Sequence, residues 1–233
     1  MVDLPENGGI VAVIAAAGSS ERFGGDKTEA LICGKPCLVH TLCAFERSGQ
    51  TVQTVVVTKK EKMSAVLSLK ETYGLKKLTA VCEGGNSRQE SAAKGFAAAD
   101  PSVKFIAVHD AARPLITPED IDRVALEAYR YGAAIAALRQ VNTVKLVEDG
   151  FVKTTVAREQ TVSAATPQIF SREIYERLIR EFYGCFSAFT DDSSMAEKLG
   201  IKVKAVICDD TNIKITSPSD ILIARAIFSE RRE

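Results

Sequence analysis

The stretch Gly9–Ala17 reads GIVAVIAAA and leads directly into Gly18-Ser-Ser-Glu-Arg-Phe-Gly-Gly25. A short apolar run rich in Val and Ile, followed at once by small and polar residues, predicts a buried strand that ends in a loop. Further strands are expected at 52–58, 78–82, 105–108, 133–138 and near 203–207, and helices at 36–47, 60–72, 87–99, 118–131, near 171–183, 190–199 and from about 218. Strands that alternate with helices in this rhythm indicate parallel β-α-β units with right-handed crossovers. The expected fold is therefore an α/β three-layer sandwich around a mostly parallel sheet.

One segment interrupts this rhythm. Residues Val144–Val156 read VKLVEDGFVKTTV, in which apolar and polar residues alternate and no helix separates the two halves. The central Asp149-Gly150 pair is a strong hairpin signal. We expect an antiparallel β-hairpin arm, over about 141–160, that protrudes from the body of a single domain covering 1–233. Such arms often mediate dimerisation; the alternative is a plain hairpin at the edge of the main sheet.

Length, charge and cysteine content narrow the class of protein. The 233 residues fit one large domain or one domain with an appendage, at roughly 150 residues per domain. Lys and Arg number 30, as do Asp and Glu, which argues against a non-specific nucleic-acid or anionic-membrane surface. With no Cys-x-x-Cys among six cysteines and only two histidines, we expect buried thiols in a reducing cytoplasm rather than a zinc site or disulfides. The acidic start predicts no signal peptide, and no apolar run is long enough to predict a membrane span.

The ligand site of such a fold lies outside the carboxyl ends of its strands. Three loops fall there, at 16–27, 83–88 and 109–114, and we expect them to converge. The first loop matches neither common phosphate-loop pattern, because Ser20 replaces a required glycine and Asp26 precedes Lys27. Its small residues and the cations Arg22 and Lys27 suit a polyphosphate; the alternative is a solvated surface turn.

The second loop, Gly84–Ser91, combines a glycine pair with the short polar side chains of Asn86 and Ser91. These groups suit the edge of a nucleobase. Ser87 with Glu90 three residues later predicts a helix N-terminus. Arg88 is expected either to contact the ligand or to lie on a solvated helix face.

The third loop, His109–Pro114, places Asp110 directly after a buried strand, with Ala111 and Ala112 behind it. Mg²⁺ prefers one or two carboxylates together with phosphate oxygens. We therefore expect Asp110 to be a metal ligand, with a helix cap or turn residue as the alternative. His109 is expected to be a packed neighbour rather than a catalytic base.

Together these loops resemble the 2-C-methyl-D-erythritol 4-phosphate cytidylyltransferases, a nucleotidyltransferase family with a dinucleotide-binding-like fold. The resemblance runs in order from about residue 10 to 228. It rests on Ala16-Ala17-Gly18 with Arg22 and Lys27, Gly34-Lys35-Pro36, Gly84–Ser91, His109–Pro114, Asn142–Lys145, Thr166-Pro167-Gln168, Thr190-Asp191-Asp192 and Asn212–Ile215. The chain departs from the family in having a shorter first loop with Asp26 in place of the usual proline, and in Asn86 and Asn142 where aspartate is usual.

The resemblance implies transfer of CMP from CTP to the phosphate of the methylerythritol phosphate acceptor, with release of pyrophosphate. It implies Mg²⁺ or another divalent cation on Asp110 and a cytoplasmic homodimer whose arm reaches the partner's site. Four cations are implied to be catalytic: Arg22 and Lys27 on the triphosphate, Lys214 on the α-phosphate and acceptor side, and Arg158 on the acceptor phosphate. The substrate-binding residues that it implies are Ala16, Ala17, Gly18, Gly85, Asn86, Arg88, Ser91, Asp110, Ala111, Arg113, Thr143, Thr166 and Thr190.

Two other functions remain open from the residues. A similar family transfers CMP to ribitol 5-phosphate, although Ala111-Ala112 and Ser163–Thr166 look more like the methylerythritol branch. A non-catalytic nucleotide sensor could keep the same fold and CTP pocket. The presence of Arg22, Asp110 and Lys214 together argues against the sensor.

Overall fold

The computed structural model describes residues 8–18 and 23–231. Its helices and strands follow one another along the chain as β1 (Ile10–Ala15), β2 (Leu31–Ile32), β3 (Lys35–Pro36), α1 (Cys37–Arg47), β4 (Thr51–Thr58), η2 (Lys60–Lys62), α2 (Met63–Tyr73), β5 (Leu78–Glu83), α3 (Arg88–Ala97), β6 (Phe105–Asp110), α4 (Pro118–Tyr131), β7 (Ala133–Arg139), β8 (Lys145–Glu148), β9 (Phe151–Thr155), η3 (Arg158–Gln160), β10 (Val162–Ser171), α5 (Arg172–Phe182), η4 (Phe186–Ala188), α6 (Asp192–Lys198), β11 (Lys204–Ile207) and α7 (Pro218–Glu230).

The main sheet has seven strands in the order β11-β7-β10-β6-β1-β4-β5. Neighbouring strands are parallel except for β10, which is antiparallel to both β6 and β7. The prediction of a mostly parallel sheet is thus confirmed. Strand β10 itself was not predicted: its first half is small and polar, and Pro167 lies where the register against β7 shifts between Ala164 and Gln168. A proline within a sequence segment argues against a strand there. The hydrogen bonds that make this segment a strand come from its pairing with β6 and β7.

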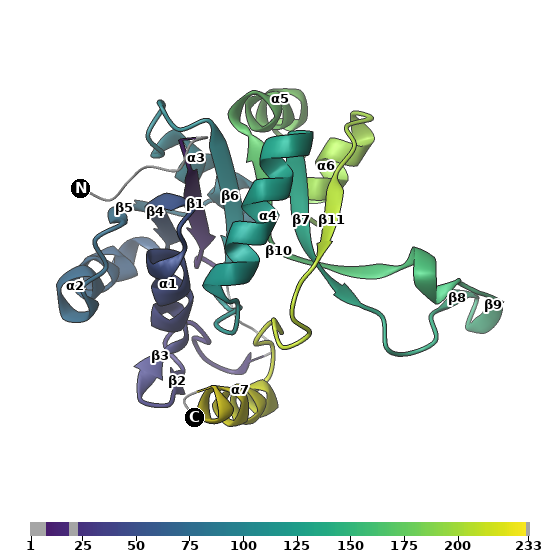
Figure 1. Cartoon of the computed structure of the whole chain (residues 1–233), viewed down its shortest axis with the longest axis horizontal. Coiled ribbons are helices and arrows are strands. Elements are labelled where there is room, and N and C mark those ends of the chain that lie inside the picture. Colours follow the sequence, from purple (N-terminus) through teal and green to yellow (C-terminus); the bar gives the residue numbers. More distant parts are fainter. Residues whose placement is uncertain (1–7, 19–22, 232–233) are drawn as a thin grey trace.

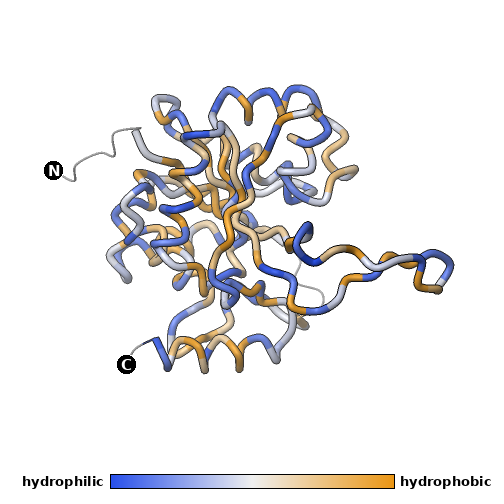
Figure 2. Tube along the Cα trace, turned by 45° about the vertical axis from the view of Figure 1, so that its right-hand side comes forward, coloured by the Kyte–Doolittle hydropathy of each residue, from blue (hydrophilic) through white to orange (hydrophobic). Residues whose placement is uncertain are grey.

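Helices cover both faces of the sheet, which gives the predicted three-layer sandwich (Figure 1). Helices α1, α2 and α4 pack on one face, and α3, α5 and α6 on the other. Helix α7 lies apart from these layers, below the sheet in Figure 1, where it packs against the short β2–β3 hairpin. Apolar residues follow the central strands, and polar residues follow most of the outer helical surface (Figure 2).

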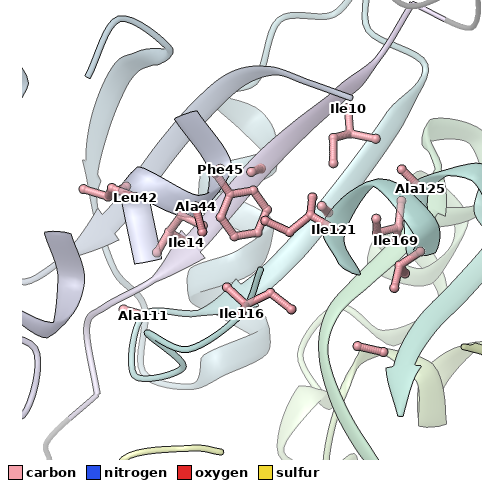
Figure 3. Close-up of a cluster of buried hydrophobic side chains, with 14 of the residues drawn as sticks. Ile10, Ile14, Leu42, Ala44, Phe45, Ala111, Ile116, Ile121, Ala125 and Ile169 are labelled. Carbon is pink, nitrogen blue, oxygen red and sulfur yellow. The ribbon is translucent and has the colours of Figure 1, made fainter. Parts of the chain in front are cut away.

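The core that holds the first strand in place comes from β1, α1 and α4. Ile10 and Ile14 of β1 meet Phe45 of α1 and Ile121 of α4, and all four side chains are fully buried (Figure 3). Burial of one such side chain contributes about 1.5–3 kcal/mol. This packing fixes the carboxyl end of β1, from which the first loop departs.

Local signals set the ends of several elements, and α4 has the predicted bounds of 118–131. Helix α3 begins after Ser87, whose hydroxyl accepts the backbone N–H of Glu90 at 3.0 Å. Helix α4 begins at Pro118, after the Thr117 cap, and ends at Gly132, which has a φ of 80°. The hairpin turn places Asp149 at φ 51° and Gly150 at φ 84°. This conformation of two consecutive residues is the one that an Asp-Gly hairpin turn requires.

Strands β8 and β9 form a two-stranded sheet of their own, separate from the main sheet. All of their residues are exposed, and the arm extends well away from the body (Figure 1). The arrangement confirms a protruding arm and excludes an edge hairpin of the main sheet.

The cysteines depart in part from expectation. Cys37 and Cys208 are buried, but Cys185 is exposed beyond α5. Within residues 8–18 and 23–231, none of the helices has the length and apolar character needed to cross a bilayer.

Candidate active site

A cavity of about 440 Å³ opens at the carboxyl ends of the central strands. This volume is in the range of small-molecule sites, roughly 300–1,000 Å³. All three predicted loops contribute to it. Its lining residues are Ala15, Ala16, Ala17, Gly18, Lys27, Thr28, Gly85, Asn86, Ser87, Arg88, Ser91, Asp110, Ala112 and Lys214. The expected convergence of the loops is therefore observed.

The first two loops approach each other at Ala17 and Gly84. A Cβ atom added to Gly84 would lie 2.4 Å from the Cβ of Ala17, so only glycine fits between the two loops. The backbone N–H of Gly84 donates to the carbonyl of Thr58 at 2.8 Å, which ties the loop to the end of β4. This contact brings the backbone around Ala17 and Gly85 to one side of the cavity.

The second loop is held by its own hydroxyl and carboxylate groups. Ser91 Oγ accepts the N–H of Gly85 at 3.0 Å and donates to the carbonyl of Ser87 at 2.9 Å. Glu90 Oε2 accepts the N–H of Asn86 at 2.8 Å. Asn86 is exposed at the mouth of the cavity. Ser91 and Glu90 thus hold the backbone N–H groups of the loop, while Gly85 and Asn86 line the cavity.

Asp110, the last residue of β6, is the centre of the site. Its Oδ2 lies 2.8 Å from Nζ of Lys214, and its Oδ1 accepts from Nε of Arg88 at 2.9 Å. Nε of Arg113 lies 3.7 Å from Oδ2. Burial by itself raises the pKa of this carboxyl, but Arg88 and Lys214 outweigh it and hold the pKa well below its usual value. Asp110 is therefore ionised throughout the physiological range.

Arg88 does not lie on a solvated helix face. Its guanidinium bridges Asp110 and Asp192, and Asp192 is fully buried at the start of α6. Tyr175 of α5 donates its hydroxyl to Oδ1 of Asp192 at 3.1 Å. Burial lowers the pKa of Arg88, but the two carboxylates outweigh it and raise that pKa. Arg88 therefore serves Asp110 as a fixed counter-ion in addition to lining the cavity.

Asp192 and Tyr175 were not predicted as site residues. Asp192 belongs to the Thr190-Asp191-Asp192 motif, but its role depends on how α6 docks onto the sheet. Gln168 of β10 decides that docking: its Nε2 donates to Oδ2 of Asp191 at 2.6 Å, and its Oε1 accepts the N–H of Ser193 at 3.0 Å. The motif around Gln168 thus presents the N-terminus of α6 to Arg88.

The segment that carries Lys214 is anchored from behind the site. Asn212 is buried, and its side-chain Nδ2 donates to the backbone carbonyl of Thr166 at 3.1 Å. The backbone carbonyl of Asn212 accepts from Nη1 of Arg113 at 2.8 Å. The N–H of Ile215 donates to the carbonyl of Ala112 at 2.8 Å. These bonds on either side of Lys214 direct its position beside Asp110.

Ten of the predicted site residues line this cavity: Ala16, Ala17, Gly18, Lys27, Gly85, Asn86, Arg88, Ser91, Asp110 and Lys214. Lining residues that were not predicted are Ala15, Thr28, Ser87 and Ala112.

Three further predicted residues lie immediately behind the cavity. Thr166 accepts the N–H of Asp110 at 3.1 Å, and Arg113 links Asp110 to Asn212. Ala111 is fully buried, and its carbonyl accepts the hydroxyl of Thr41 at 2.9 Å. These residues support the site from within the fold.

The other predicted residues lie elsewhere. Thr143 and Arg158 are exposed at the base of the arm, and Thr190 is exposed before α6. Within the described part of one chain, these three residues do not join the lining of the cavity. Arg22 lies outside the described residues.

The side chains that line the cavity can hold a divalent cation only if a phosphate ligand supplies further oxygen atoms to it. No group of three metal-ligating side chains occurs among residues 8–18 and 23–231. Asp110 provides one ionised carboxylate at the cavity wall, and Mg²⁺ commonly takes one or two carboxylates and completes its shell with phosphates and water. Asp110 is thus suited to hold Mg²⁺ that is also bound by a triphosphate.

The fold and the site define a class of protein. A small-residue loop after the first strand, a polar loop after β5, and cations gathered around one carboxylate at the strand ends are the arrangement of a nucleotidyltransferase. A family model described as 2-C-methyl-D-erythritol 4-phosphate cytidylyltransferase matches residues 10–230. The chain belongs to this family, and it is a cytidylyltransferase.

Individual relatives match nearly the whole chain. Two proteins named 2-C-methyl-D-erythritol 4-phosphate cytidylyltransferase, from Dehalococcoides mccartyi and Pelotomaculum thermopropionicum, are 37% and 38% identical to it. The matches cover 95% and 96% of this chain and 96% and 95% of those proteins. The crystal structure of 4-diphosphocytidyl-2C-methyl-D-erythritol synthase from Anaerococcus prevotii matches with a TM-score of 0.84 and 28% identity, covering 96% of this chain and 100% of that chain. The resemblance drawn from the motifs is confirmed.

Proposed function

We propose that the protein transfers CMP from CTP to 2-C-methyl-D-erythritol 4-phosphate and releases pyrophosphate. The observation that carries this proposal is the cluster around Asp110, where Arg88, Arg113 and Lys214 are three cations set against the carboxylates of Asp110 and Asp192. The cluster is net positive before Lys27 is counted. Such a site suits a reaction between two phosphate anions.

In this reaction a phosphate oxygen of the acceptor attacks the α-phosphorus of CTP. A new P–O bond forms, the bond between the α-phosphorus and the bridging oxygen breaks, and pyrophosphate leaves with that electron pair. The acceptor phosphate is already ionised, so no side chain has to act as a nucleophile. Positioning and charge stabilisation then supply most of the acceleration.

Each cation has a proposed place along the reacting phosphates. Lys27 holds the triphosphate from the first loop, and we assign Arg22 to the same task from the sequence resemblance. Lys214 faces the α-phosphate and the acceptor, where charge develops. Mg²⁺ held by Asp110 and the triphosphate would neutralise charge on the phosphate oxygens. Arg88 keeps Asp110 oriented toward the cavity.

Choice of the base is proposed to reside in the second loop. Gly85 and Asn86 line the cavity, where the backbone carbonyl of Gly85 is an acceptor and the side-chain amide of Asn86 supplies both a donor and an acceptor. A bound base would cover these groups, and a base that left them unpaired would be rejected strongly, because hydrogen bonds left unmade in a covered site are costly. This supports CTP as the preferred nucleotide.

The arm supports a homodimer with shared sites. Apolar side chains are exposed along it, including Phe151 at 78%, Val152 at 64% and Val147 at 62%. A two-stranded hairpin alone is marginally stable in water, so packing these apolar side chains against another protein surface would stabilise the arm. Two-fold pairing would supply one. Arg158 and Thr143, at the base of the arm, are then proposed to serve the partner's acceptor pocket.

The decisive experiment offers the purified protein CTP and Mg²⁺ with one polyol phosphate at a time and measures pyrophosphate. We expect release with 2-C-methyl-D-erythritol 4-phosphate and little with ribitol 5-phosphate. Preference for ribitol 5-phosphate would reassign the acceptor. Nucleotide binding without pyrophosphate release would favour a sensor instead.

A further inference from the structure

The turn that carries Lys27 is held by a lysine outside the cavity. Asp26 Oδ1 accepts the backbone N–H of Thr28 at 2.8 Å and its hydroxyl at 2.6 Å. The N–H of Glu29 donates to the carbonyl of Asp26 at 3.2 Å, which closes a turn over Asp26–Glu29. Lys27 occupies the second position of this turn, and both Lys27 and Thr28 line the cavity.

Lys62 reaches both ends of the same turn. This residue ends η2, after β4, and its ammonium contacts Oδ2 of Asp26 and lies 2.8 Å from Oε1 of Glu29. The side chains of Lys62 and Asp26 are only 21% and 19% exposed, which reduces screening of their attraction by water. Lys62 is not among the cavity residues. The contacts therefore join the turn to a neighbouring element without occupying the site.

The ion pair between Lys62 and Asp26 also sets the net charge next to Lys27, where the phosphates would bind. Burial raises the pKa of Asp26, but Lys62 and Thr28 outweigh it and keep that pKa below its usual value, so Asp26 is a carboxylate at neutral pH. A carboxylate next to Lys27 would repel a triphosphate if it were left alone. The ammonium of Lys62 neutralises it while leaving the Thr28 bonds in place.

We propose that Lys62 and Asp26 form a positioning pair, in which Asp26 shapes the Lys27 turn and Lys62 cancels the negative charge that this shaping introduces. The pair acts through Lys27 and Thr28 on the phosphates of the nucleotide, and in that respect it rests on the proposed function. Its loss should therefore weaken phosphate binding far more than it slows the chemical step.

The test compares Lys62→Met with Lys60→Met by steady-state kinetics and by calorimetric titration with CTP and with inorganic pyrophosphate. Lys60 lies on the same η2 segment, is exposed, and forms no ion pair with residues 8–18 or 23–231, so its loss removes an equal charge without opening the pair. For Lys62→Met we expect the KM for CTP and the Kd for pyrophosphate to rise about tenfold, since a carboxylate is left unpaired near the phosphates. A change in kcat of less than about twofold would show that binding rather than chemistry is affected.

The double variant Asp26→Asn with Lys62→Met separates this role from simple stabilisation of the loop. Asparagine keeps an oxygen for the Thr28 bonds and removes the half-buried carboxylate next to Lys27. The Glu29 carboxylate, which also loses Lys62, is 65% exposed and therefore largely screened by water, so the double variant should bind within about threefold of the unchanged protein. Thermal unfolding of every variant checks that the fold is retained. Equal effects of Lys62→Met and Lys60→Met, or a double variant as weak as Lys62→Met, would overturn the proposal. An unchanged protein that binds neither CTP nor pyrophosphate would reject the proposed function, and the pair with it.

Discussion

Lys214 Nζ lies 2.8 Å from Oδ2 of Asp110, although the two residues come from distant parts of the chain. Asp110 ends a central strand, whereas Lys214 precedes the last helix on a segment anchored by Asn212 and Ile215. Arg88 occupies the other carboxylate oxygen. Lys214 is 37% exposed, so of the two cations it is the one more open to a ligand.

Replacing Lys214 with methionine should lower kcat about 100-fold, the usual cost of removing one group that stabilises transition-state charge. The measurement is the rate of pyrophosphate release at saturating CTP. Lys202→Met is the control, because Lys202 is exposed on the loop before β11. Similar rates for the two variants would remove Lys214 from the reaction.

Activity should require a divalent cation. Asp110→Asn should impair turnover severely, because the amide cannot bring a negative charge to Mg²⁺ and also leaves Lys214 and Arg88 without their shared counter-ion. The check is pyrophosphate release with excess chelator and after Mg²⁺ is restored. Full activity in chelator would exclude the metal role of Asp110.

Stability should fall as the solution becomes mildly acidic, because of His109. Its ring is fully buried, packs edge-on against Phe45 at 5.0 Å, and burial lowers its pKa from 6.5 to about 3. Below pH 6.5 the unfolded chain binds a proton that the folded protein excludes, so the free energy of unfolding falls as pH falls. Between pH 7 and pH 5 this group should cost about 2 kcal/mol.

Urea unfolding at the two pH values measures that loss. His109→Gln is expected to be less stable than the unchanged protein at neutral pH but to lose less stability on acidification. An equal loss in both proteins would mean that other groups carry the pH dependence.

Gly84→Ala should raise the KM for CTP about tenfold, because the new methyl group would lie 2.4 Å from the Cβ of Ala17 and must separate the first two loops. Gly49→Ala is a matched control, since its added Cβ would meet its nearest neighbour, Asp122, at 3.4 Å. Calorimetric titration with CTP gives the affinities directly. If Gly84→Ala binds CTP as tightly as Gly49→Ala does, the close approach of the loops is unimportant for the nucleotide.

Mixing two inactive variants should restore activity if the arm serves the partner's site. Arg158→Ala and Lys214→Ala should each be nearly inactive alone. In their heterodimer, one site would receive Arg158 from the second subunit and keep Lys214 of the first, so random exchange should give about a quarter of full activity. If the arm serves its own subunit, every site lacks one cation. Absence of rescue in verified heterodimers would therefore reject the shared site.

Local sequence signals predicted an element well where a single residue type determines the backbone conformation. The helix predicted over 118–131 is observed as α4, and the predicted Asp149-Gly150 turn has the positive φ angles of a hairpin turn, because proline and glycine have strong backbone preferences of their own. Strand β10 escaped prediction because its pairing partners β6 and β7, rather than its own residues, supply its hydrogen bonds. The same dependence on distant partners hid Asp192, which becomes a counter-ion of Arg88 only after Gln168 docks α6.

The sequence alone determined the alternation of strands and helices, the three loops at the strand ends and the family. Periodicity, turn residues and short motifs depend only on residues that are close together in the sequence. Tertiary structure decided which charges meet: Arg88 turns inward to Asp110 and Asp192, and Lys62 pairs with Asp26. Ion pairs between distant segments depend on packing in three dimensions. Their partners become neighbours only when buried strands and docked helices remove the water and bring the charges within a few ångströms.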